Sequence, residues 1–471
     1  MRLGSKELTR ITHSEFRNSE ILNGKKLTGV STDSRTLNGG DLFFALRGEN
    51  FDGHRFLSEV FAKGAVAAVV ESRADLSACA DKPLLLVEDT ARALGELAHL
   101  YRMMFEIPVL AVGGSNGKTT TKEMISSVLR SAYALLSTEG NLNNHIGVPQ
   151  TLFRLEKKHE IAVVEIGTNH PGEIEHLCSV LHPTHALITN VGKEHLEFFG
   201  SVEGVADEEG KLFDHLKRRK STVAFVNADD EYVRARSRGI KRQITYGVQS
   251  KRVDVSAQVL GTDVVGAPRL RLTGKKLSRN IEIQLSVPGE HNALNAAAAF
   301  AVGLHFKVSP RIIAKALESF QPVGERMQVI HVGGVTILND TYNANPDSTI
   351  AALRTLSTMK VTGKRIAVLA DMRELGAHSK AEHARVGEAA SQLGLDYLLT
   401  FGEQARTIHD AARVPFTAHY DQKNMLAEYL AELAGPGDAI LVKGSRGMKM
   451  EDIVAFLEER LQTPSLAQKR Y

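Results

Sequence analysis

The sequence predicts an α/β protein built on parallel sheets, and two observations predict this class. Short, mostly apolar runs recur along the chain, for example at residues 65–70, 108–112 and 161–166. Helix-like stretches such as residues 91–105 alternate with these runs. Strands that are apolar on both faces suit parallel sheets covered by helical crossovers. Regular alternation of such strands with helices is the pattern of the α/β class.

The apolar runs fall into three blocks, which we predict to be three domains: residues 1–86, 87–322 and 323–471. A domain usually takes about 100–200 residues, so 471 residues allow this number. Pro322 and Gly324 mark the last boundary, although a surface turn has the same composition. The runs that we predict as strands lie at residues 65–70, 83–87, 108–112, 161–166, 185–191, 221–226, 335–340, 365–370, 397–402 and 439–444.

One segment of the middle block has a different pattern. Residues 251–291 alternate apolar and polar residues and are rich in glycine. Alternation with a period of two is typical of strands that have one buried and one exposed face. We therefore predict antiparallel hairpins within or beside the second domain.

Composition excludes several classes of protein. The net charge is only +3, and the one dense basic run, residues 217–220, fits a solvated helix end better than a nucleic-acid patch. Two cysteines, Cys79 and Cys178, cannot form a disulfide framework, which favours a reducing compartment. No apolar stretch approaches the ~18 residues of a membrane span, and the first residues lack the apolar core of a signal peptide. We predict a cytoplasmic protein without a membrane span.

A glycine-rich loop joins the run at 108–112 to a helix-like stretch. The usual phosphate-loop spacing G-x-x-x-x-G-K-[ST] would need glycine where Val112 stands, so the loop is the shorter form Gly114-x-x-Gly117-Lys118-Thr119. Its place between a buried strand and a helix predicts a phosphate site, because loop N–H groups and the helix dipole favour an anion. The alternative is a glycine-rich turn with a capping threonine. The residues expected to contact the phosphates are Gly114, Ser115, Asn116, Gly117, Lys118, Thr119 and Thr120.

The motif also predicts a magnesium site. Lys118 would reach the β- and γ-phosphates, and the Thr119 hydroxyl would bind Mg²⁺. Glu165 ends the run at 161–166, and a carboxylate beside the phosphates suits an oxygen-seeking cation. A carboxylate at a strand end can also merely cap the next turn.

These motifs resemble those of the Mur ligases, the ATP-dependent amide-forming enzymes of peptidoglycan synthesis. GSNGKTT (114–120) is similar to the family's ATP loop, and further segments match in order over roughly residues 28–455. The MurF type fits best, because residues 397–406 lack the D-N-P-R motif of a MurE-type ligase. The other matching segments are residues 31–56, 138–149, 165–177, 188–201, 287–299, 339–348, 371–383 and 441–452.

The resemblance implies an architecture and a reaction. It implies a small N-terminal α/β domain that binds the UDP-muramyl substrate, a central parallel sheet of the P-loop type with flanking helices, and a Rossmann-like C-terminal domain for the incoming D-Ala-D-Ala. The implied substrates are ATP, UDP-MurNAc-tripeptide and D-Ala-D-Ala, with two Mg²⁺ ions. The tripeptide carboxylate would attack the γ-phosphate, and the dipeptide amine would then displace phosphate from the acyl phosphate. No nucleic-acid partner is implied, and we expect a monomer.

Residue roles follow from the same resemblance. His195, shortly after the run at 185–191, would bind the second metal; without the resemblance it is a surface histidine. Arg326 and Asp340 would reach phosphate and ribose from the third domain, since an arginine fork bonds two oxygens. The remaining nucleotide-side residues are Asn292, Tyr342 and Asn345, of which the last can also be a turn residue before Pro346.

One position departs from the family pattern. Glu209 stands where Mur ligases commonly carry a lysine whose carbamate binds the second metal. We hypothesise that Glu209 replaces the carbamate. A carbamoylated Lys211 is the rival hypothesis, and solvated helix charges are the third possibility.

The other substrates need polar side chains of their own. The UDP-muramyl site is expected at Ser31, Ser34, Arg35, Asp52, Gly53 and His54, although the same residue types shape turns. The peptide would contact Asn143, Asn144 and His145. For D-Ala-D-Ala we expect a cation at the carboxylate and acids at the ammonium; the candidates are Lys443, Ser445, Arg446, Asp371 and Glu374.

Two rival functions stay open at this point. Another ligase of the superfamily, of the MurE or folylpolyglutamate synthase type, shares the GKT loop but does not explain STDSR…DGH (31–54) together with YNANP (342–346) and KGSRGMKME (443–451). A non-catalytic P-loop protein could keep Lys118 for binding alone. Because Arg326 and Asp340 belong to a different block from Lys118, we also expect an open, inactive form that closes on its substrates.

Overall fold

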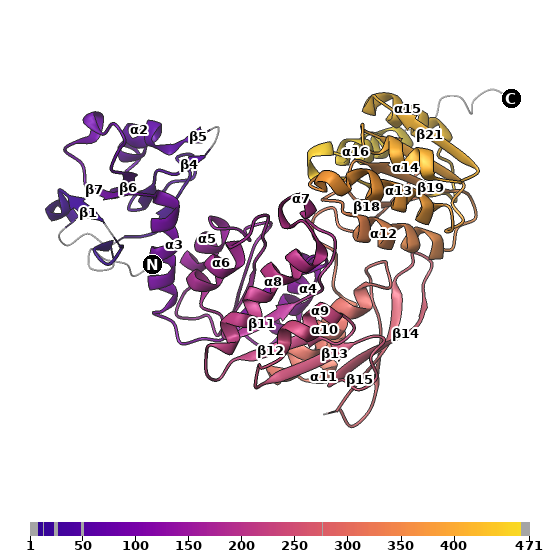
Figure 1. The fold of residues 1–471 in the computed structure, drawn as a ribbon, viewed down its shortest axis with the longest axis horizontal. Coiled ribbons are helices and arrows are strands. Elements are labelled where there is room, and N and C mark those ends of the chain that lie inside the picture. The colour runs from indigo at the N-terminus through magenta and orange to yellow at the C-terminus, as the bar shows by residue number, and fades with distance from the viewer. Residues whose placement is uncertain (1–7, 13, 23–26, 49–50, 276, 463–471) are drawn as a thin grey trace.

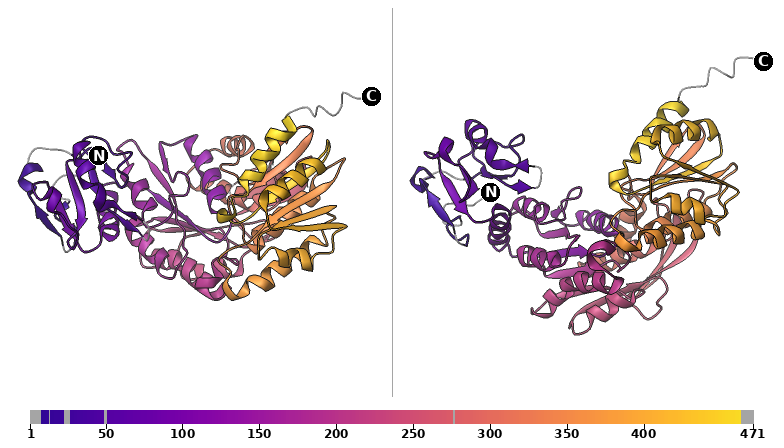
Figure 2. Two further views of the ribbon diagram at one scale, coloured as in Figure 1. Left: turned by 90° about the horizontal axis from the view of Figure 1, so that it is seen from above. Right: turned by 45° about the horizontal axis from the view of Figure 1, so that its top comes forward.

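The computed structural model describes residues 8–12, 14–22, 27–48, 51–275 and 277–462. Within this part of the chain, three larger sheets follow one another along the sequence. Figure 1 shows them as three bodies, with the central one between the other two, and the views in Figure 2 agree. The α/β class is confirmed. The outer ends of the first and last predicted blocks, residues 1–7 and 463–471, lie outside the described residues.

The first sheet has the order β1-β7-β6-β3-β2 and is parallel except at β1. A separate small hairpin, β4 with β5, lies beside it, and α2 (Leu57–Ala62) follows. Helix α3 (Thr90–Arg102) packs against β6 and also against two helices of the central domain, so it joins the two bodies. The strands are β1 (Glu15–Arg17), β2 (Val30–Ser31), β3 (Leu42–Phe44), β4 (Arg47–Gly48), β5 (Phe51–Asp52), β6 (Ala67–Glu71) and β7 (Leu84–Val87).

The central sheet has the order β16-β15-β14-β13-β12-β11-β8-β10-β9. It is parallel from β9 to β14, and β14 to β16 continue it as the antiparallel hairpins that the sequence predicts. The strands are β8 (Val109–Gly113), β9 (Leu135–Ser137), β10 (Ile161–Glu165), β11 (His185–Ile188), β12 (Val223–Asn227), β13 (Gln243–Gly247), β14 (Val255–Thr262), β15 (Pro268–Gly274) and β16 (Ile281–Gln284).

Helices cover both faces of this sheet, so β8, which lies between β10 and β11, is buried throughout. In β8, Leu110 and Val112 pack with α4 (Lys118–Arg130) and α10 (Asn292–His305), whereas Val109 and Ala111 face the opposite cluster. Alternating side chains of a strand point to opposite faces, which is why a wholly apolar run is needed here. The other helices are α5 (Gly147–Phe153), α6 (Glu173–Leu181), α7 (Leu196–Phe199), α8 (Val202–Lys217), α9 (Glu231–Ser237) and α11 (Pro310–Glu318).

The third sheet has the order β17-β18-β22-β19-β20-β21 and is parallel except for β17. Helices α12 (Pro346–Thr358), α13 (Ser379–Ala390) and α14 (Arg406–Ala411) supply residues to one apolar cluster, and α15 (Lys423–Leu433) and α16 (Glu451–Gln462) to another. The strands are β17 (Gln328–Val332), β18 (Val335–Asp340), β19 (Arg365–Ala370), β20 (Tyr397–Phe401), β21 (Phe416–Tyr420) and β22 (Ala439–Lys443).

Other expectations from the sequence can be checked against the fold. Every predicted apolar run overlaps a strand, and residues 319–327 connect α11 to β17 without regular structure, as expected around Pro322 and Gly324. The basic run at 217–220 ends α8, with Lys217, Arg218 and Lys220 exposed. Among the described helices, none is long and apolar enough to cross a membrane.

Candidate active site

The glycine-rich loop leaves the carboxyl end of β8 and leads into α4. Gly114 (φ 112°) and Gly117 (φ 77°) have left-handed conformations that side chains rarely adopt. A Cβ at Gly114 would lie 2.4 Å from Thr189 Oγ1, and one at Gly117 would lie 3.0 Å from Asn295 Oδ1. The loop therefore needs glycine at both positions, for backbone angle and for space. The first N–H groups of α4 have no partner within the helix and face the position that an anion would take.

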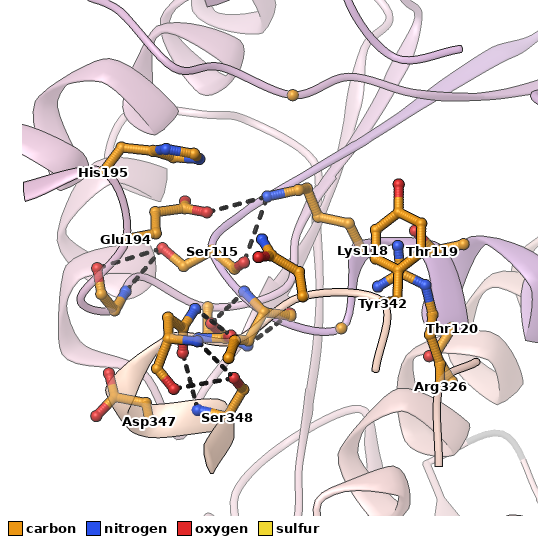
Figure 3. Close-up of a pocket in the computed structure, with 18 of the residues that line it drawn as sticks. Ser115, Lys118, Thr119, Thr120, Glu194, His195, Arg326, Tyr342, Asp347 and Ser348 are labelled. Atoms are coloured by element: carbon orange, nitrogen blue, oxygen red, sulfur yellow. Dashed lines mark hydrogen bonds and ion pairs between the residues drawn. The ribbon is translucent and has the colours of Figure 1, made fainter. Parts of the chain in front are cut away.

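Lys118 is the first residue of α4 and is surrounded by carboxylates. Its Nζ lies 3.2 Å from Glu194 Oε2 and donates a hydrogen bond to the Ser115 carbonyl at 3.3 Å (Figure 3). Burial opposes the charge of Lys118, but Glu194, Glu209 and Glu165 together raise its pKa above the usual value. Lys118 therefore remains a cation near neutral pH.

Glu165 ends β10, and it has an oxygen free for a ligand. Its Oε1 accepts hydrogen bonds from Thr119 Oγ1 at 3.1 Å and from Asn143 Nδ2 at 2.9 Å, whereas its buried Oε2 has no partner. Glu194 Oε1 is likewise buried without a partner. Hydroxyl and carboxylate oxygens are the donors that Mg²⁺ prefers, so these residues fit the magnesium ion that the loop motif predicts. Over the described ranges, no three His, Cys, Asp or Glu side chains converge as a ready-made metal site.

His195 lies on the same loop as Glu194, just before α7, and contacts the third domain. Its Nδ1 lies 2.6 Å from Glu374 Oε2, and this contact is the main reason that the pKa of Glu374 falls below its usual value. Glu374 is thus engaged with His195, the residue predicted to bind the second metal, rather than held open for a dipeptide ammonium.

Glu209, on α8, lies beneath the glycine-rich loop and not on the cavity wall. It is completely buried, and its Oε2 accepts a hydrogen bond from Gly114 N at 2.7 Å, while its Oε1 has no partner. Burial, with the charge of Glu194 adding to it and that of Lys118 opposing it, raises the pKa of Glu209 above its usual value. The interpretation as a solvated helix charge is therefore wrong for Glu209. Lys211 is half-buried and does not line the cavity either, and a metal role for either residue stays a prediction.

A cavity of about 890 Å³ opens between the central and the third domain. The loop of Lys118 forms one wall, and the segments after β18, β19 and β22 form the other. Asn345 Nδ2 donates a hydrogen bond to Asn116 Oδ1 at 2.8 Å, so the two walls touch. The carboxyl ends of parallel strands from both sheets meet here, which is where α/β proteins usually bind ligands.

The nucleotide-side candidates lie together in this cavity. The Arg326 guanidinium stacks 3.7 Å from the Tyr342 ring centroid (Figure 3). Beneath the loop, Asn295 links Asn292 to Thr121 through hydrogen bonds of 2.9 and 3.0 Å. These amides are buried and used structurally, although both line the cavity.

The residues predicted to receive D-Ala-D-Ala differ in their availability. Lys443 is 3% exposed, and its Nζ contacts Asp340 Oδ2 at 2.5 Å, so its charge is already matched. Arg446 pairs with Glu325 at 2.9 Å. Asp371 Oδ1 accepts a hydrogen bond from Ala405 N at 2.8 Å, and Asp371 does not line the cavity. Asp371 therefore fixes the loop after β20, and its predicted contact with the ammonium is not assembled in this structure.

Ser445 and the peptide-side candidates line the cavity, and two of them also make hydrogen bonds that hold the local backbone. Ser445 Oγ accepts from Arg373 N at 2.8 Å and donates to the Ala344 carbonyl at 3.3 Å. Asn144 Oδ1 accepts from the N–H groups of Ile146 and Gly147 at the start of α5. All four candidates line the cavity: Asn143, Asn144, His145 and Ser445.

The candidates in the first domain lie outside this cavity. His54 Nδ1 is 2.7 Å from Asp52 Oδ1, and its Nε2 accepts a hydrogen bond from Glu71 N at 2.9 Å, so both ring nitrogens have partners. Gly53 packs against the Leu46 backbone, where a Cβ would come within 2.9 Å. Local contacts with Asp33 engage Ser31 Oγ and the Arg35 side chain, and the Ser34 carbonyl accepts a hydrogen bond from Lys63 Nζ at 2.8 Å. Their role toward a substrate stays a prediction.

Sequence reasoning missed three residues of the site. Glu194 is the direct partner of Lys118, Arg373 lines the cavity, and Lys193 Nζ contacts Glu382 Oε1 at 2.5 Å across the domain boundary. Glu194 precedes His195 directly, and its place after a buried strand was the available signal. The other two depend on tertiary partners that no sequence spacing reveals.

Comparison with known proteins identifies the family. The model "Mur ligase middle domain" matches residues 112–303, "Mur ligase, glutamate ligase domain" matches 325–446, and "Mur ligase family, catalytic domain" matches 26–102. The chain is 37% identical to a UDP-N-acetylmuramoyl-tripeptide–D-alanyl-D-alanine ligase of Bacillus subtilis, over 92% of this chain and 93% of the relative. The chain belongs to the Mur ligase family. The Escherichia coli ligase of the same name is also 37% identical, with 96% and 98% coverage.

Solved structures agree with this assignment. The Mur ligase described here superimposes on MurF from Acinetobacter baumannii with a TM-score of 0.89 at 32% identity, covering 98% and 99% of the two chains. A MurF ligase from Thermotoga maritima, solved in complex with ADP, gives 0.82 at 29% identity, with 93% and 98% coverage. The three-domain architecture expected from the resemblance is thereby confirmed.

Proposed function

We propose that this Mur ligase joins D-alanyl-D-alanine to UDP-N-acetylmuramoyl-tripeptide and converts ATP to ADP and phosphate. The observation that carries this proposal is the shared cavity, in which the phosphate loop of one domain faces the cationic loops of another. The full-length relatives named for this reaction support it, and they do not favour a MurE-type or folylpolyglutamate ligase. The Thermotoga maritima ligase, solved in complex with ADP, supports nucleotide binding.

The first step brings two anions together. The tripeptide carboxylate attacks the γ-phosphorus of ATP, a P–O bond to ADP breaks, and an acyl phosphate forms. Lys118 is held as a cation beside the loop, where it offsets negative charge that develops on the phosphoryl oxygens. Arg326 would add a second cation from the opposite wall when the domains close.

Magnesium belongs to the proposal as well. When bound, Mg²⁺ supplies positive charge that reduces repulsion between the two anions. Thr119 Oγ1 and Glu165, whose Oε2 is buried and unpartnered, would hold it, and Asn143 fixes the orientation of Glu165. A second ion near His195 remains part of the proposal because Glu194 Oε1 is open beside it.

In the second step the dipeptide amine attacks the acyl carbon and phosphate leaves. The C-terminal wall would orient the dipeptide, and Glu374, already beside His195, closes the cavity near the reacting end. We also propose that the enzyme acts in the cytoplasm, as a monomer and without a nucleic-acid partner.

The test is an omission experiment on the purified enzyme. Phosphate release and pentapeptide formation, followed by mass spectrometry, should require ATP, UDP-MurNAc-tripeptide and D-Ala-D-Ala together. Lys118→Met should lower kcat by about 10²–10³-fold because the phosphoryl charge loses its cation. Lys275→Met is the matched control, since Lys275 is exposed and pairs with Asp254 away from the cavity. Turnover without D-Ala-D-Ala, or equal activity of the two variants, would overturn the proposal.

A further inference from the structure

The cavity wall carries six lysine and arginine side chains, and most of them already have a partner. Lys118 contacts Glu194, Lys193 contacts Glu382, Lys443 contacts Asp340 and Arg446 contacts Glu325, all within 3.2 Å; Arg326 stacks on Tyr342. Arg373 is the exception. Among the residues that the structure describes, no carboxylate pairs with its guanidinium, whose one recorded polar contact is Nη2 to Met448 Sδ at 3.7 Å.

The surroundings of Arg373 fix its direction. Its backbone N–H donates to Ser445 Oγ at 2.8 Å, which ties the loop after β19 to the loop after β22. The preceding N–H, that of Met372, donates to the buried His383 Nε2 at 3.0 Å. A Cβ at Gly447 would lie 2.3 Å from Arg373 Nη1, so the guanidinium rests against bare backbone at that glycine. The arginine is therefore held against the wall by packing, and although its charge acts on the neighbouring Glu374, it forms no ion pair with a described carboxylate.

We infer that Arg373 receives the terminal carboxylate of the incoming D-alanyl-D-alanine, an inference that rests on the proposed function. An arginine fork bonds both oxygens of a carboxylate in one plane, which gives direction as well as attraction. Lys443 could bind the same carboxylate only by leaving Asp340, and separating a buried charge pair is costly. Arg373 breaks no ion pair when it binds.

The position of Arg373 also suits the reaction. Arg373 and Glu374 are consecutive, and Glu374 reaches across to His195 on the wall that carries Lys118. A dipeptide anchored by its carboxylate at Arg373 therefore lies between the two walls. Its amine end is then free to point toward the phosphate loop, where the acyl phosphate forms.

A substrate and enzyme double-substitution cycle tests this assignment. The wild-type enzyme and Arg373→Met are each assayed with D-Ala-D-Ala and with D-alanyl-D-alaninamide, whose C-terminus is uncharged. We expect Arg373→Met to raise KM for D-Ala-D-Ala by about 10- to 100-fold, the usual range for one hydrogen-bonded charge contact. The amide should bind equally weakly to both enzymes. Arg373→Lys keeps the positive charge but lacks the guanidinium fork, so its KM for D-Ala-D-Ala should lie between those of the wild type and Arg373→Met.

Controls separate binding from folding and from the proposed function. Arg406→Met removes an exposed arginine of the same domain that pairs with Asp421 outside the cavity, and it should leave both KM values unchanged. The KM for ATP should be the same in all variants. If Arg373→Met keeps the wild-type KM, or still prefers carboxylate to amide, the inference is overturned although the function stands. A wild-type enzyme that does not use D-Ala-D-Ala would overturn both.

Discussion

At the scale of single residues, the site is a lysine among three buried carboxylates. Lys118 is surrounded by Glu165, Glu194 and Glu209, and at least one oxygen of each carboxylate is buried without a partner. Unpaired buried oxygens are costly in a native protein and call for an explanation. Glu165 and Glu194 line the cavity, where their free oxygens would meet cations. Glu209 instead supports the glycine-rich loop from below.

Glu209 provides the first prediction. Glu209→Ala removes the acceptor for Gly114 N–H, so we expect the free energy of unfolding to fall by about 1–3 kcal/mol. KM for ATP should also rise, because the loop loses its anchor. Glu209→Gln keeps an oxygen at that position and should stay close to the wild type. The activity of the wild type should not depend on added bicarbonate, and the Lys211→Ala enzyme should remain active.

Denaturation in urea and steady-state kinetics check this prediction. Bicarbonate-dependent activity that Lys211→Ala abolishes would contradict it and would favour the carbamoylated lysine. If Glu209→Gln is as damaging as Glu209→Ala, the charge opposite Lys118 matters more than the hydrogen bond.

Several of these residues were predictable from the sequence, and the reasons differ. Lys118 and Thr119 follow from the glycine-rich loop between a buried strand and a helix, and Glu165 follows from its place at the end of a buried strand; both patterns are local. Glu194 has only a weak signal, its place after a buried strand, and Arg373 has none, since their roles depend on which neighbours are left unpaired after folding. Lys443 has the right position after β22 for an anion site, but its pairing with Asp340 joins strands a hundred residues apart.

At the scale of elements, the phosphate site is one strand, one loop and one helix. The apolar run of β8 was visible in the sequence because both faces of the strand are buried. Strands β13 and β21 were not predicted, since their residues are mixed in polarity and largely half-buried or exposed. Strand β21 is at the edge of its sheet, where a strand needs fewer apolar residues, so its sequence resembles a loop.

The second prediction concerns the turn between β8 and α4. Gly114→Ala should abolish nucleotide binding, because the new Cβ would meet Thr189 Oγ1 at 2.4 Å and Asn190 O at 2.9 Å. Gly239→Ala is the matched control: Gly239 also has a positive φ, of 89°, but nothing lies within 4 Å of its Cβ position. The control should therefore show only backbone strain, of about 1 kcal/mol. Calorimetric titration with ADP measures binding, and a Gly114→Ala enzyme that binds ADP normally would refute the argument.

At the scale of the whole molecule, the two ends of the strands of the central sheet differ: one end is a polar site, and the other is an aromatic group. The carboxyl ends of its strands carry the site, whereas His185 at the start of β11 lies in an aromatic group with Phe225 and Phe306. Its Nε2 is 3.1 Å from His305 Nε2, an arrangement that needs one ring to accept and so disfavours charge on both. Burial, with His305 and Arg242 adding to it, lowers the pKa of His185 to about 3.

The third prediction is a loss of stability in acid. The pKa of His185 in the folded state is below its unfolded value of 6.5. The stability that the neutral ring contributes is therefore fully present above pH 6.5 and is lost as the pH falls toward 3. Between pH 7.5 and 4.5 the wild type should lose about 2–3 kcal/mol more than His185→Gln. Urea unfolding at the two pH values measures the difference. His331→Gln, on an exposed histidine of β17, should follow the wild type. An equal loss of unfolding free energy between the two pH values in the wild type and in His185→Gln would contradict the prediction.

The wall shared by two domains has a consequence for inhibition. Neither domain alone carries both Lys118 and Arg373, and around the cavity the two domains meet through polar contacts that include Asn116 with Asn345 and His195 with Glu374. A small molecule wedged into that seam need not imitate a nucleotide, a sugar or a peptide. By holding the central and third domains apart, it would inactivate the enzyme without blocking any one of the binding sites.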